Sequence, residues 1–535
     1  MLTPDTTRGT AAADTAAADT AGTPSHESFD AHPARARVRN AQIAGRIMPA
    51  EEAAALIPAG ATVGMSGFTG AGYPKELPQA LADRITAANA AGQRMRVNVW
   101  TGASTAPELD GVLAEAEGVE LRLPYQSDPT TRREINAGRM EYLDMHLSHV
   151  AQSAWQGFLG KLDIAVIEVT GVTEDGRLIP SSSVGNNKTW IERADAVILE
   201  VNARQPAELE GMHDVYYGTA LPPYRTPVPI NRPTDRIGVP HLICPPEKVI
   251  AVVPTDSPDR NTPFAPPDDT SRQIAGHVLD FLTHEVRQGR LPENLLPLQS
   301  GVGNVANAVL AGLDEGPFEN LTAYTEVIQD GMLHLIDTGK LVGVSATAFS
   351  LSSDTVEKFN ARAGEYRDKI VLRPQEISNH PEVVRRLGCL AMNGMIEADI
   401  YGNINSTHVM GSRIQNGIGG SGDFARNGLI SFFLSPSRAK QGAISSIVPM
   451  VSHVDHTEHD VDVIVTEQGL ADLRGLSPKQ RAQQIIKNCA HPDYRPALED
   501  YYARALRTSY GCHTPHLLTE SLSWHNRFME TGSMR

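Results

Sequence analysis

Short apolar runs separated by glycine and proline turns recur along most of this chain. Continuous runs of this kind predict strands of a parallel sheet that is covered on both faces. Segments between them read as helices, the alternation that α/β domains show. The pattern predicts strands at 61–65, 96–100, 163–169, 196–201, 248–253, 324–328, 341–347, 370–372, 428–433 and 462–466. It predicts helices at 50–56, 76–88, 305–313, 381–387, 478–488 and 496–506.

A proline-rich stretch at 221–235 divides this pattern into two halves. The second half repeats the order of the first, since the glycine turn and helix that begin at Gly301 echo those that begin at Gly67. We therefore expect an α/β protein of two tandem, related domains with mainly parallel sheets. The expected divisions are a disordered tail at 1–36, a first domain at 37–230, a second at 231–520, and a C-terminal tail at 521–535.

Composition narrows the class of protein. A chain of 535 residues with 41% hydrophobic and 21% charged residues is long and apolar enough for two or more globular cores. Its formal net charge of −16 argues against nucleic acid or an anionic membrane as partner, although a local basic patch can still bind an anionic ligand. No apolar run approaches the ~20 residues of a membrane span.

Several features point to the cytoplasm, and one group of histidines raises the question of a metal. The four scattered cysteines form no CxxC pair, which fits a reducing compartment. Residues 1–30 have no apolar core for a secretory signal.

His453, His456 and His459 recur every three residues and invite a metal interpretation, but their segment is polar and loop-like. We expect hydrogen-bonded loop histidines there.

One acidic residue interrupts an otherwise apolar predicted strand. Glu326 lies inside 324–328, between apolar and β-branched neighbours, and the strand ends at a Gln-Asp-Gly turn. Burying an ion without partners is expensive, so two interpretations are open. Glu326 either faces water on an edge strand or lines a pocket as a nucleophile or base.

Two glycine-rich turns favour the pocket. They lie at 299–304, upstream of Glu326, and at 417–424, downstream of it. Such turns bring backbone N–H groups close to a ligand, and acyl transfer needs a nucleophile together with donors for an oxyanion. A third glycine turn, at 66–75, follows a strand and precedes a helix, but it lacks the strict GxGxxG of a dinucleotide site.

Three segments carry a resemblance to a known family. Residues 325–331 (TEVIQDG), 417–424 (GIGGSGDF) and 465–473 (VTEQGLADL) resemble the acetyl-CoA hydrolase/transferase family, a branch of the class I coenzyme A transferases. The resemblance runs from about residue 39 to about residue 507. It implies two related halves with the active site between them, and it places the turn at 66–75 beside the acyl and pantetheine channel.

The resemblance also implies roles for individual residues. Glu326 becomes the nucleophile, and the backbone N–H groups of Val302 and Gly420 become the oxyanion hole. Asn379 contacts the acyl group or thioester, and Glu467 orients the site. The implied CoA-binding residues are Gln299, Ser300, Gly301, Val302, Gly303, Asn416, Gly420 and Lys440, with Arg438 a weaker candidate.

Plainer interpretations of these residues stay open. Gly301 and Gly417 fit tight turns equally well, and Asn379 precedes a predicted helix as an N-cap does. Glu467 follows a strand, where an exposed turn acid is common. Apart from the family resemblance, a lone lysine such as Lys440 more often lies on the solvent-exposed surface than in a binding site.

The implied activity is transfer of CoA between a short-chain acyl-CoA, such as succinyl-CoA or acetyl-CoA, and a carboxylic acid, such as acetate or succinate. It runs as a ping-pong reaction through a glutamyl-CoA thioester, with CoA as substrate and no permanently bound cofactor or metal. Acyl-CoA and short carboxylic acids are the expected partners, and we expect a homodimer. Two alternatives stay open: an acetyl-CoA hydrolase that uses the same intermediate, and a non-catalytic CoA-binding protein.

Overall fold

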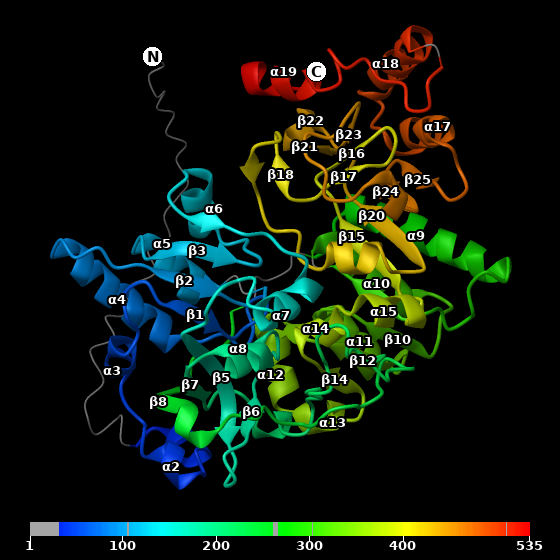
Figure 1. The fold of residues 1–535 in the computed structure, drawn as a ribbon. Helices are drawn as coiled ribbons and strands as arrows, with labels where there is room; N and C mark the ends of the chain where they lie inside the picture. The colour runs from blue at the N-terminus through cyan, green and yellow to red at the C-terminus, as the bar shows by residue number, and fades with distance from the viewer. Residues whose placement is uncertain (1–30, 104–105, 261–265, 302, 510) are drawn as a thin grey trace.

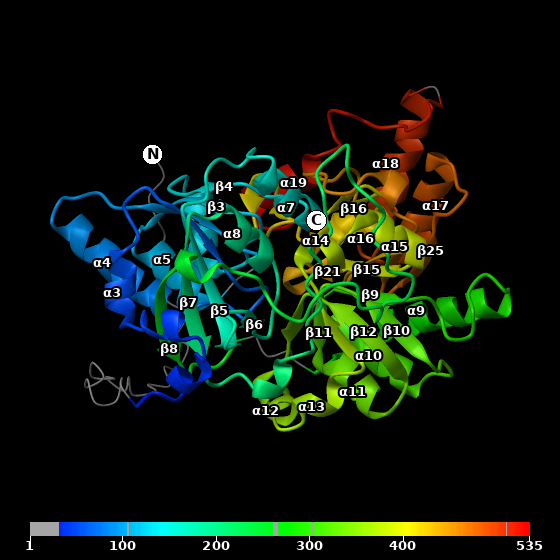
Figure 2. The same ribbon diagram turned by 60° about the horizontal axis from the view of Figure 1, so that its bottom comes forward.

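The structure is a computed structural model that describes residues 31–103, 106–260, 266–301, 303–509 and 511–535. Two α/β lobes lie side by side, the first in blue to teal with a green strand (β8) and the second in green to red (Figures 1 and 2). Each lobe is built around one large sheet, as the alternation of apolar runs and helices predicts. The expected fold class is therefore confirmed.

The first sheet has the order β4-β3-β2-β1-β5-β7-β8, with β6 paired to β5. Its neighbouring strands are parallel except for β6, which runs antiparallel. Every residue of β5 is buried, because helices and loops cover both faces of the sheet. The strands are β1 (Thr62–Met65), β2 (Val97–Trp100), β3 (Val119–Leu123), β4 (Glu141–Tyr142), β5 (Ile164–Val172), β6 (Leu178–Pro180), β7 (Ala196–Asn202) and β8 (Val249–Thr255).

The second sheet has the order β14-β12-β10-β9-β15-β20-β24-β25. All its pairs are parallel except that of β24 with β25. Its strands are β9 (Leu298–Ser300), β10 (Leu321–Tyr324), β12 (Leu341–Ala346), β14 (Ile370–Leu372), β15 (Leu390–Gly394), β20 (Ile430–Leu434), β24 (Val463–Thr466) and β25 (Gly469–Asp472). Smaller sheets contain β11 (Val327–Gln329), β13 (Ala348–Ser350), β16 (Glu397–Asp399), β17 (Ile404–Asn405), β18 (His408–Val409), β19 (Arg413–Ile414), β21 (Arg438–Ala439), β22 (Ile444–Ser445) and β23 (Ile447–Val448).

Helices pack on both sheets. Those of the first lobe are η1 (Pro33–Arg37), α2 (Ala41–Ala44), α3 (Ala50–Ala55), α4 (Glu76–Ala90), η2 (Pro107–Gly111), α5 (Val112–Glu115), α6 (Pro129–Asn136), α7 (Leu147–Trp155), α8 (Asn187–Arg193), η3 (Ala207–Leu209) and η4 (Pro246–Lys248). Those of the second are α9 (Asp269–Arg287), α10 (Asn304–Glu315), α11 (Asp330–Asp337), α12 (Ser353–Asn360), α13 (Ala363–Tyr366), α14 (Gln375–Ser378), α15 (Pro381–Leu387), α16 (Ser421–Ala425), η5 (Lys440–Gly442), η6 (Glu458–Asp460), α17 (Pro478–Cys489), α18 (Arg495–Thr508) and α19 (Ser523–Thr531).

The strand predicted at 324–328 is interrupted at the acidic residue. β10 ends at Tyr324 and β11 begins at Val327, so Thr325 and Glu326 lie between two strands. The chain leaves the large sheet there and enters the two-stranded β11–β13 sheet. The Glu326 carbonyl accepts hydrogen bonds from the amides of Thr347 and Ala348, which hold the break in place. A periodic apolar pattern does not reveal this change of sheet.

Three of the expected domain divisions differ from the structure. β8 lies after the expected division at residue 230, yet it pairs with β7 of the first sheet. Residues 521–535, expected as a tail, include α19, whose Trp524 is buried. Within the expected tail at 1–36, residues from Pro33 belong to η1, and residues 1–30 lie outside the described range. Burial of scattered apolar side chains, which strand and helix patterns miss, explains the ordered C-terminal segment.

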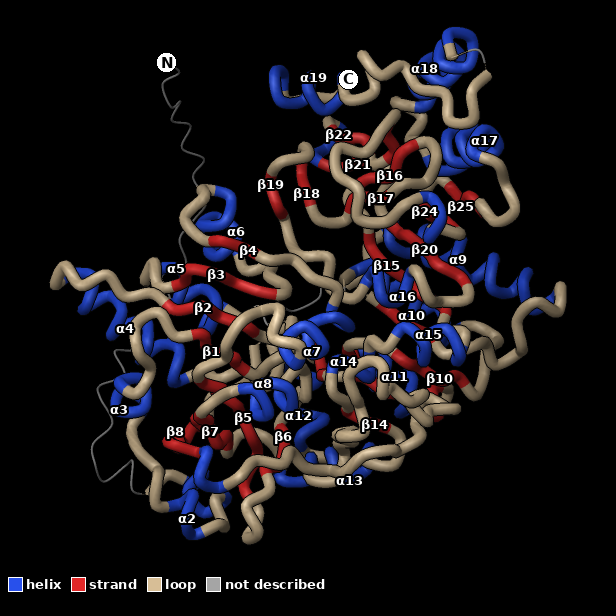
Figure 3. Tube along the Cα trace, in the orientation of Figure 1, coloured by secondary structure: helices blue, strands red, loops and turns tan. Residues whose placement is uncertain are grey.

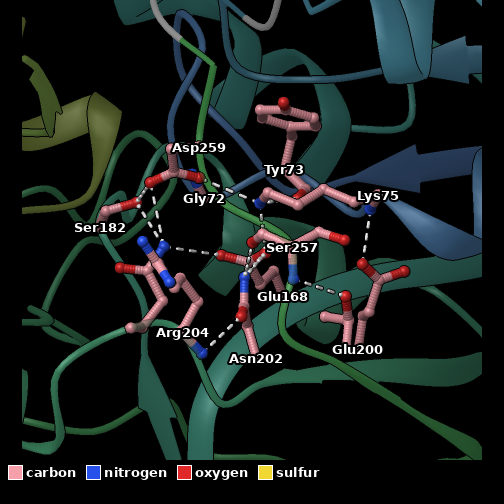
Figure 4. A network of polar contacts seen from close by, with 12 residues as sticks. Gly72, Tyr73, Lys75, Glu168, Ser182, Glu200, Asn202, Arg204, Ser257 and Asp259 are labelled. Atoms are coloured by element: carbon pink, nitrogen blue, oxygen red, sulfur yellow. Dashed lines mark hydrogen bonds and ion pairs between the residues drawn. The ribbon is translucent and has the colours of Figure 1, made fainter. Parts of the chain in front are cut away.

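A buried polar network holds the start of α4 (Figure 4). The Lys75 ammonium lies 2.5 Å from Glu168 Oε2 in β5 and 3.0 Å from Asp259 Oδ1, beyond β8. The Glu200 carboxylate at β7 accepts the amides of Lys75 and Leu77. The glycine turn that the sequence places before α4 is thus tied to the centre of the first sheet and to the chain after β8.

The two lobes meet through ordered contacts. α7 of the first lobe lies against α14 of the second, in a region rich in loops (Figure 3). Arg373 pairs with Asp214 across the interface, and the Lys188 ammonium lies 3.2 Å from Glu376 Oε1. All four side chains are buried. Within the described ranges, none of the helices combines the length and apolar character that crossing a bilayer requires.

Candidate active site

A cavity of about 350 Å³ lies between the lobes. It collects the carboxyl ends of β1, β2 and β3 from the first sheet and of β9, β10 and β15 from the second, which is where parallel sheets bind ligands. The described residues that line it are Phe68, Thr69, Ala103, Tyr125, Leu147, Ser300, Gly301, Glu326, Val327, Asn393, Gly394, Met395, Ile396, Ser406, Asn416, Gly417, Ile418, Gly419, Gly420 and Ser421.

Glu326 lies in this cavity and does not face bulk water. Its side chain is partly buried, and Asn379 Nδ2 donates a hydrogen bond of 2.7 Å to its Oε1. Burial raises the pKa of Glu326 to about 7, the Asn379 hydrogen bond opposes that shift, and the nearby charge of Asp423 adds to it. A carboxylate with a raised pKa in an interlobe cavity is a candidate nucleophile.

Gly420 packs directly against this carboxylate. A Cβ at residue 420 would lie 1.9 Å from Glu326 Oε1 and 2.3 Å from Asn379 Nδ2, so no other residue type fits without displacing them. Gly420 is also the N-cap of α16. None of the described residues accepts a hydrogen bond from its amide N–H. The backbone at Gly420 is therefore close to the nucleophile and has a donor available for a ligand.

Asn379 is fully buried at the C-terminal end of α14. His380, not Asn379, is the N-cap of α15, and no side chain caps that helix. The Asn379 amide instead donates to Glu326 and, at 3.4 Å, to Asp423 Oδ2. The helix-capping interpretation left open by the sequence does not describe this residue.

The predicted CoA-binding residues divide into two groups. Ser300, Gly301, Asn416 and Gly420 line the cavity with Glu326. Gln299 is buried within the sheet, where its Oε1 accepts the Met392 amide at 3.0 Å.

Gly303 precedes α10 with a φ of 120°, which favours glycine. Gly303 is absent from the described lining of the cavity. Val302 lies outside the described residues, so its predicted amide donor has no structural account here.

Glu467 and Lys440 lie away from this cavity. Glu467 Oε2 accepts the Ser437 amide at 2.7 Å, and Oε1 accepts the Ser437 hydroxyl. Burial opposes the charge of Glu467, but these hydrogen bonds outweigh it and hold its pKa below the ordinary value. Lys440 is exposed and belongs to a separate groove between the lobes, and Arg438 is exposed nearby.

On the first-lobe side of the site, the sequence indicated the turn at 66–75, whose Phe68 and Thr69 line the cavity, but it did not indicate Tyr125 or Asp144. Tyr125, after β3, lines the cavity, and the charge of Glu326 adds to the burial that raises its pKa. Asp144 accepts the Ile418 amide through both carboxylate oxygens, at 3.0 and 2.9 Å. Neither residue belongs to a glycine motif. Asp423 of the second lobe, which accepts from Asn379, was not predicted as a site residue either, although it lies inside the 417–424 motif.

The histidines at 453–459 are part of a hydrogen-bonded loop. His453 Nε2 lies 3.3 Å from Asp455 Oδ1, and His456 Nε2 lies 3.1 Å from the Ser421 hydroxyl. Across the part of the chain that the structure describes, no group of three or more His, Cys, Asp or Glu side chains is arranged to hold a metal ion.

Solved structures share the fold. RipA from Yersinia pestis matches with a TM-score of 0.67 at 22% identity, covering 88% of this chain and 99% of that one. A 4-hydroxybutyrate CoA-transferase from Porphyromonas gingivalis matches with a TM-score of 0.58 at 22% identity, covering 86% of this chain and 98% of the other. This chain therefore shares its overall fold with both solved structures.

Sequence comparison identifies the family. The N-terminal domain of the acetyl-CoA hydrolase/transferase family matches residues 33–254, and the C-terminal domain matches residues 357–502. The succinyl-CoA:acetate CoA-transferase of Clostridium kluyveri is 52% identical over 93% of this chain and 92% of its own length.

Relatives with two further activities also match. The propanoyl-CoA:succinate CoA transferase of Escherichia coli is 46% identical over 91% of this chain and 98% of its own. The acetyl-CoA hydrolase of Saccharomyces cerevisiae is 44% identical over 93% of this chain and 97% of its own. The chain belongs to the acetyl-CoA hydrolase/transferase family and is an enzyme of that family.

Proposed function

We propose that this enzyme transfers CoA from a short-chain acyl-CoA, such as succinyl-CoA or acetyl-CoA, to a carboxylic acid, such as acetate or succinate. One observation carries the proposal: the partly buried Glu326 carboxylate lies in the interlobe cavity, in contact with Asn379 and against the Gly420 backbone. This is the arrangement of a nucleophile with adjacent donors.

The chemistry balances without a permanent cofactor. Glu326 attacks the thioester carbonyl, the C–S bond breaks, and a mixed anhydride and CoA thiolate form. The thiolate attacks the glutamyl carbonyl and releases the first carboxylic acid as its carboxylate, which leaves a glutamyl-CoA thioester. A second carboxylate attacks this thioester and reverses the sequence. Ping-pong kinetics follow because the first acid leaves before the second binds.

Each attack passes through a tetrahedral oxyanion. The Gly420 amide is a suitable donor because it lies beside Glu326 and none of the described residues accepts from it. The Val302 amide stays a prediction for the second donor. One donor of this kind is worth about 2.7–4 kcal/mol of transition-state stabilisation.

The nucleotide end of CoA needs positive charge, and a groove of about 540 Å³ provides it. Arg132 and Arg133 of α6 line it from the first lobe, and Arg413 and Lys440 line it from the second. No acidic side chain is among its described lining residues, in a chain whose net charge is −16. The segment 413–417 connects this groove to the cavity, because Ile414 and Gln415 line the groove and Asn416 and Gly417 line the cavity. We propose Lys440 as a contact to CoA phosphate.

Hydrolysis is the second candidate, since relatives named acetyl-CoA hydrolase match at 44–45% identity. The test follows succinyl-CoA and ¹³C-labelled acetate with the purified enzyme by mass spectrometry. Transfer predicts ¹³C-acetyl-CoA in proportion to succinate released, and thioester loss that depends on acetate. Release of free CoA at an unchanged rate without added acid would instead establish the hydrolase. The expected homodimer stays a prediction that light scattering would test.

A further inference from the structure

Asp423 is a buried carboxylate that the reaction scheme above does not use. It is the third residue of α16, and only 4% of its surface is exposed. Its Oδ1 accepts the Ser148 hydroxyl at 2.6 Å, and its Oδ2 accepts the Ser148 amide at 3.0 Å. Ser148 lies in the first turn of α7, in the other lobe. A second-lobe carboxylate thus accepts two hydrogen bonds from the first lobe.

The same carboxylate contacts the residue that holds the nucleophile. The Asn379 NH₂ group has two hydrogens, and its nitrogen lies 2.7 Å from Glu326 Oε1 and 3.4 Å from Asp423 Oδ2. The Asn379 Oδ1 accepts the Ser378 hydroxyl at 2.8 Å. One hydrogen of the NH₂ group is donated to Glu326 and the other to Asp423. These contacts turn the NH₂ group of Asn379 toward Glu326 and its oxygen toward Ser378.

A reciprocal contact holds the other end of the same segment. Asp144 of the first lobe accepts the amide of Ile418, two residues before Gly420, and Asp423 lies three residues after it. The first lobe therefore fixes the segment 418–423 on both sides of the glycine that packs against Glu326. A displacement of about 1 Å in such a segment is enough to reduce a rate about 10²-fold.

We propose that Asp423 is a positioning residue for the reaction at Glu326: it orients the Asn379 amide toward the nucleophile and fixes the segment after Gly420 against the first lobe. This inference rests on the proposed function. Asp423 is absent from the described lining of the cavity, so it acts through Asn379 and Ser148 and does not touch acyl-CoA. Its loss is expected to lower kcat more than it raises KM.

Asp423→Asn separates the hydrogen bonds of Asp423 from its charge. The carbonyl oxygen can still accept from Ser148 and Asn379, and the new NH₂ group can donate to the Ser148 hydroxyl. The negative charge is lost. The negative charge of Asp423 raises the pKa of Glu326, so its loss lowers that pKa. The acidic limb of the pH–rate profile is therefore expected to move to lower pH. The other titratable groups close to the pair are Tyr125, Asp144, His146 and His149.

Asp423→Ala removes all three contacts. We expect kcat to fall about 10²-fold while KM for acyl-CoA stays within about threefold, and Asp423→Asn to keep kcat within about tenfold of the unmodified enzyme. Asp399→Asn is the matched control, because Asp399 is equally buried, has a pKa also raised by burial to about 6, and accepts only local hydrogen bonds. Its acidic limb is expected to stay in place.

An unshifted acidic limb in Asp423→Asn, or a full kcat in Asp423→Ala, overturns the inference. A loss shared equally by the Ala and Asn variants also overturns it, since orientation by hydrogen bonding would then be irrelevant. If Asp423→Ala fails to fold, the pH profile of Asp423→Asn decides. Trapping of a glutamyl thioester on unmodified enzyme separates the two claims: its absence rejects the proposed function, whereas its presence with unaltered Asp423 variants rejects only this inference.

Discussion

The Glu326 carboxylate is placed by three kinds of contact. Its backbone lies at a break between β10 and β11, its Oε1 accepts from Asn379, and the backbone of Gly420 packs against it. Burial raises its pKa to about 7. These features keep the carboxylate inside the cavity while allowing it to ionise near neutral pH, as a nucleophile requires.

The pH dependence of the first half-reaction follows from this pKa. Below a pH of about 7 the Glu326 carboxyl group is protonated and cannot attack, so kcat/KM for acyl-CoA is expected to rise with pH through about 7. The profile reports the free enzyme, and neighbouring Asp423 makes the apparent value a property of the pair. Initial rates between pH 5.5 and 8.5 give the measurement. A rate that is flat down to pH 5.5 would show that burial does not hold the proton on Glu326.

A methyl group at residue 420 tests the close contact between the Gly420 backbone and the Glu326 carboxylate. Gly420→Ala places a Cβ 1.9 Å from Glu326 Oε1, which displaces the nucleophile or the donor backbone. We expect kcat to fall about 10²-fold or more. Gly276→Ala, in α9, is the control, because a Cβ there has no heavy atom within 4 Å. Equal activity of the two variants would contradict the geometry.

At the scale of elements, the turn before α4 depends on buried charges. The Lys75 ammonium pairs with Glu168 and Asp259, and its pKa is raised because these partners outweigh the cost of burial. Asp259 also accepts the Gly72 amide at 3.0 Å. One cation thus connects a strand, a turn and the chain after β8 (Figure 4). The same turn supplies Phe68 and Thr69 to the cavity.

Lys75→Met is expected to destabilise the first lobe strongly. It leaves two buried carboxylates without their cation, and breaking a buried pair in this way costs about 3–5 kcal/mol. Chemical denaturation measures the loss. Lys161→Met is the control, since Lys161 pairs with Asp163 and Asp195 but its side chain is 67% exposed. An equal loss of stability in both variants would show that the buried Lys75 network contributes no more than an exposed ion pair does.

Regular elements were largely predictable, and interactions between distant segments were not. The strands at 370–372 and the helix at 381–387 match β14 and α15, because short apolar runs and a proline at the first helical turn are local signals. The break at Glu326 and the helix α19 depend on what other segments pack there. Glu326 was predicted from a carboxylate in an apolar run and from its motif, whereas Asp144, Tyr125 and Ser148 reach the site through the tertiary fold.

At the scale of the molecule, the site belongs to neither lobe alone. The cavity combines strand ends from both sheets, and the basic groove combines α6 with residues of the second lobe. The buried pairs Arg373–Asp214 and Lys188–Glu376 fix the lobes against each other. Unfolding of one lobe alone would leave buried charges of the other lobe without their partners, which favours lobes that unfold together.

We therefore expect one cooperative unfolding transition for the whole chain. Asp214→Asn should lower its midpoint without splitting it, because the buried Arg373 loses its charged partner while the rest of the interface persists. Calorimetry, with calorimetric and van't Hoff enthalpies compared, is the measurement. Two separate transitions in the unmodified enzyme would show that the lobes are independent and that the site has no rigid frame.

The central claim is that Glu326 carries CoA as a thioester. The most direct measurement mixes the enzyme with acyl-CoA, reduces it with borohydride, and maps the modified peptide by mass spectrometry. We expect reduction of the glutamyl group at Glu326 to an alcohol, and we expect no such product from Glu326→Gln. An unmodified Glu326 peptide, from enzyme that is active in the transfer assay and was incubated with acyl-CoA before reduction, would contradict this claim.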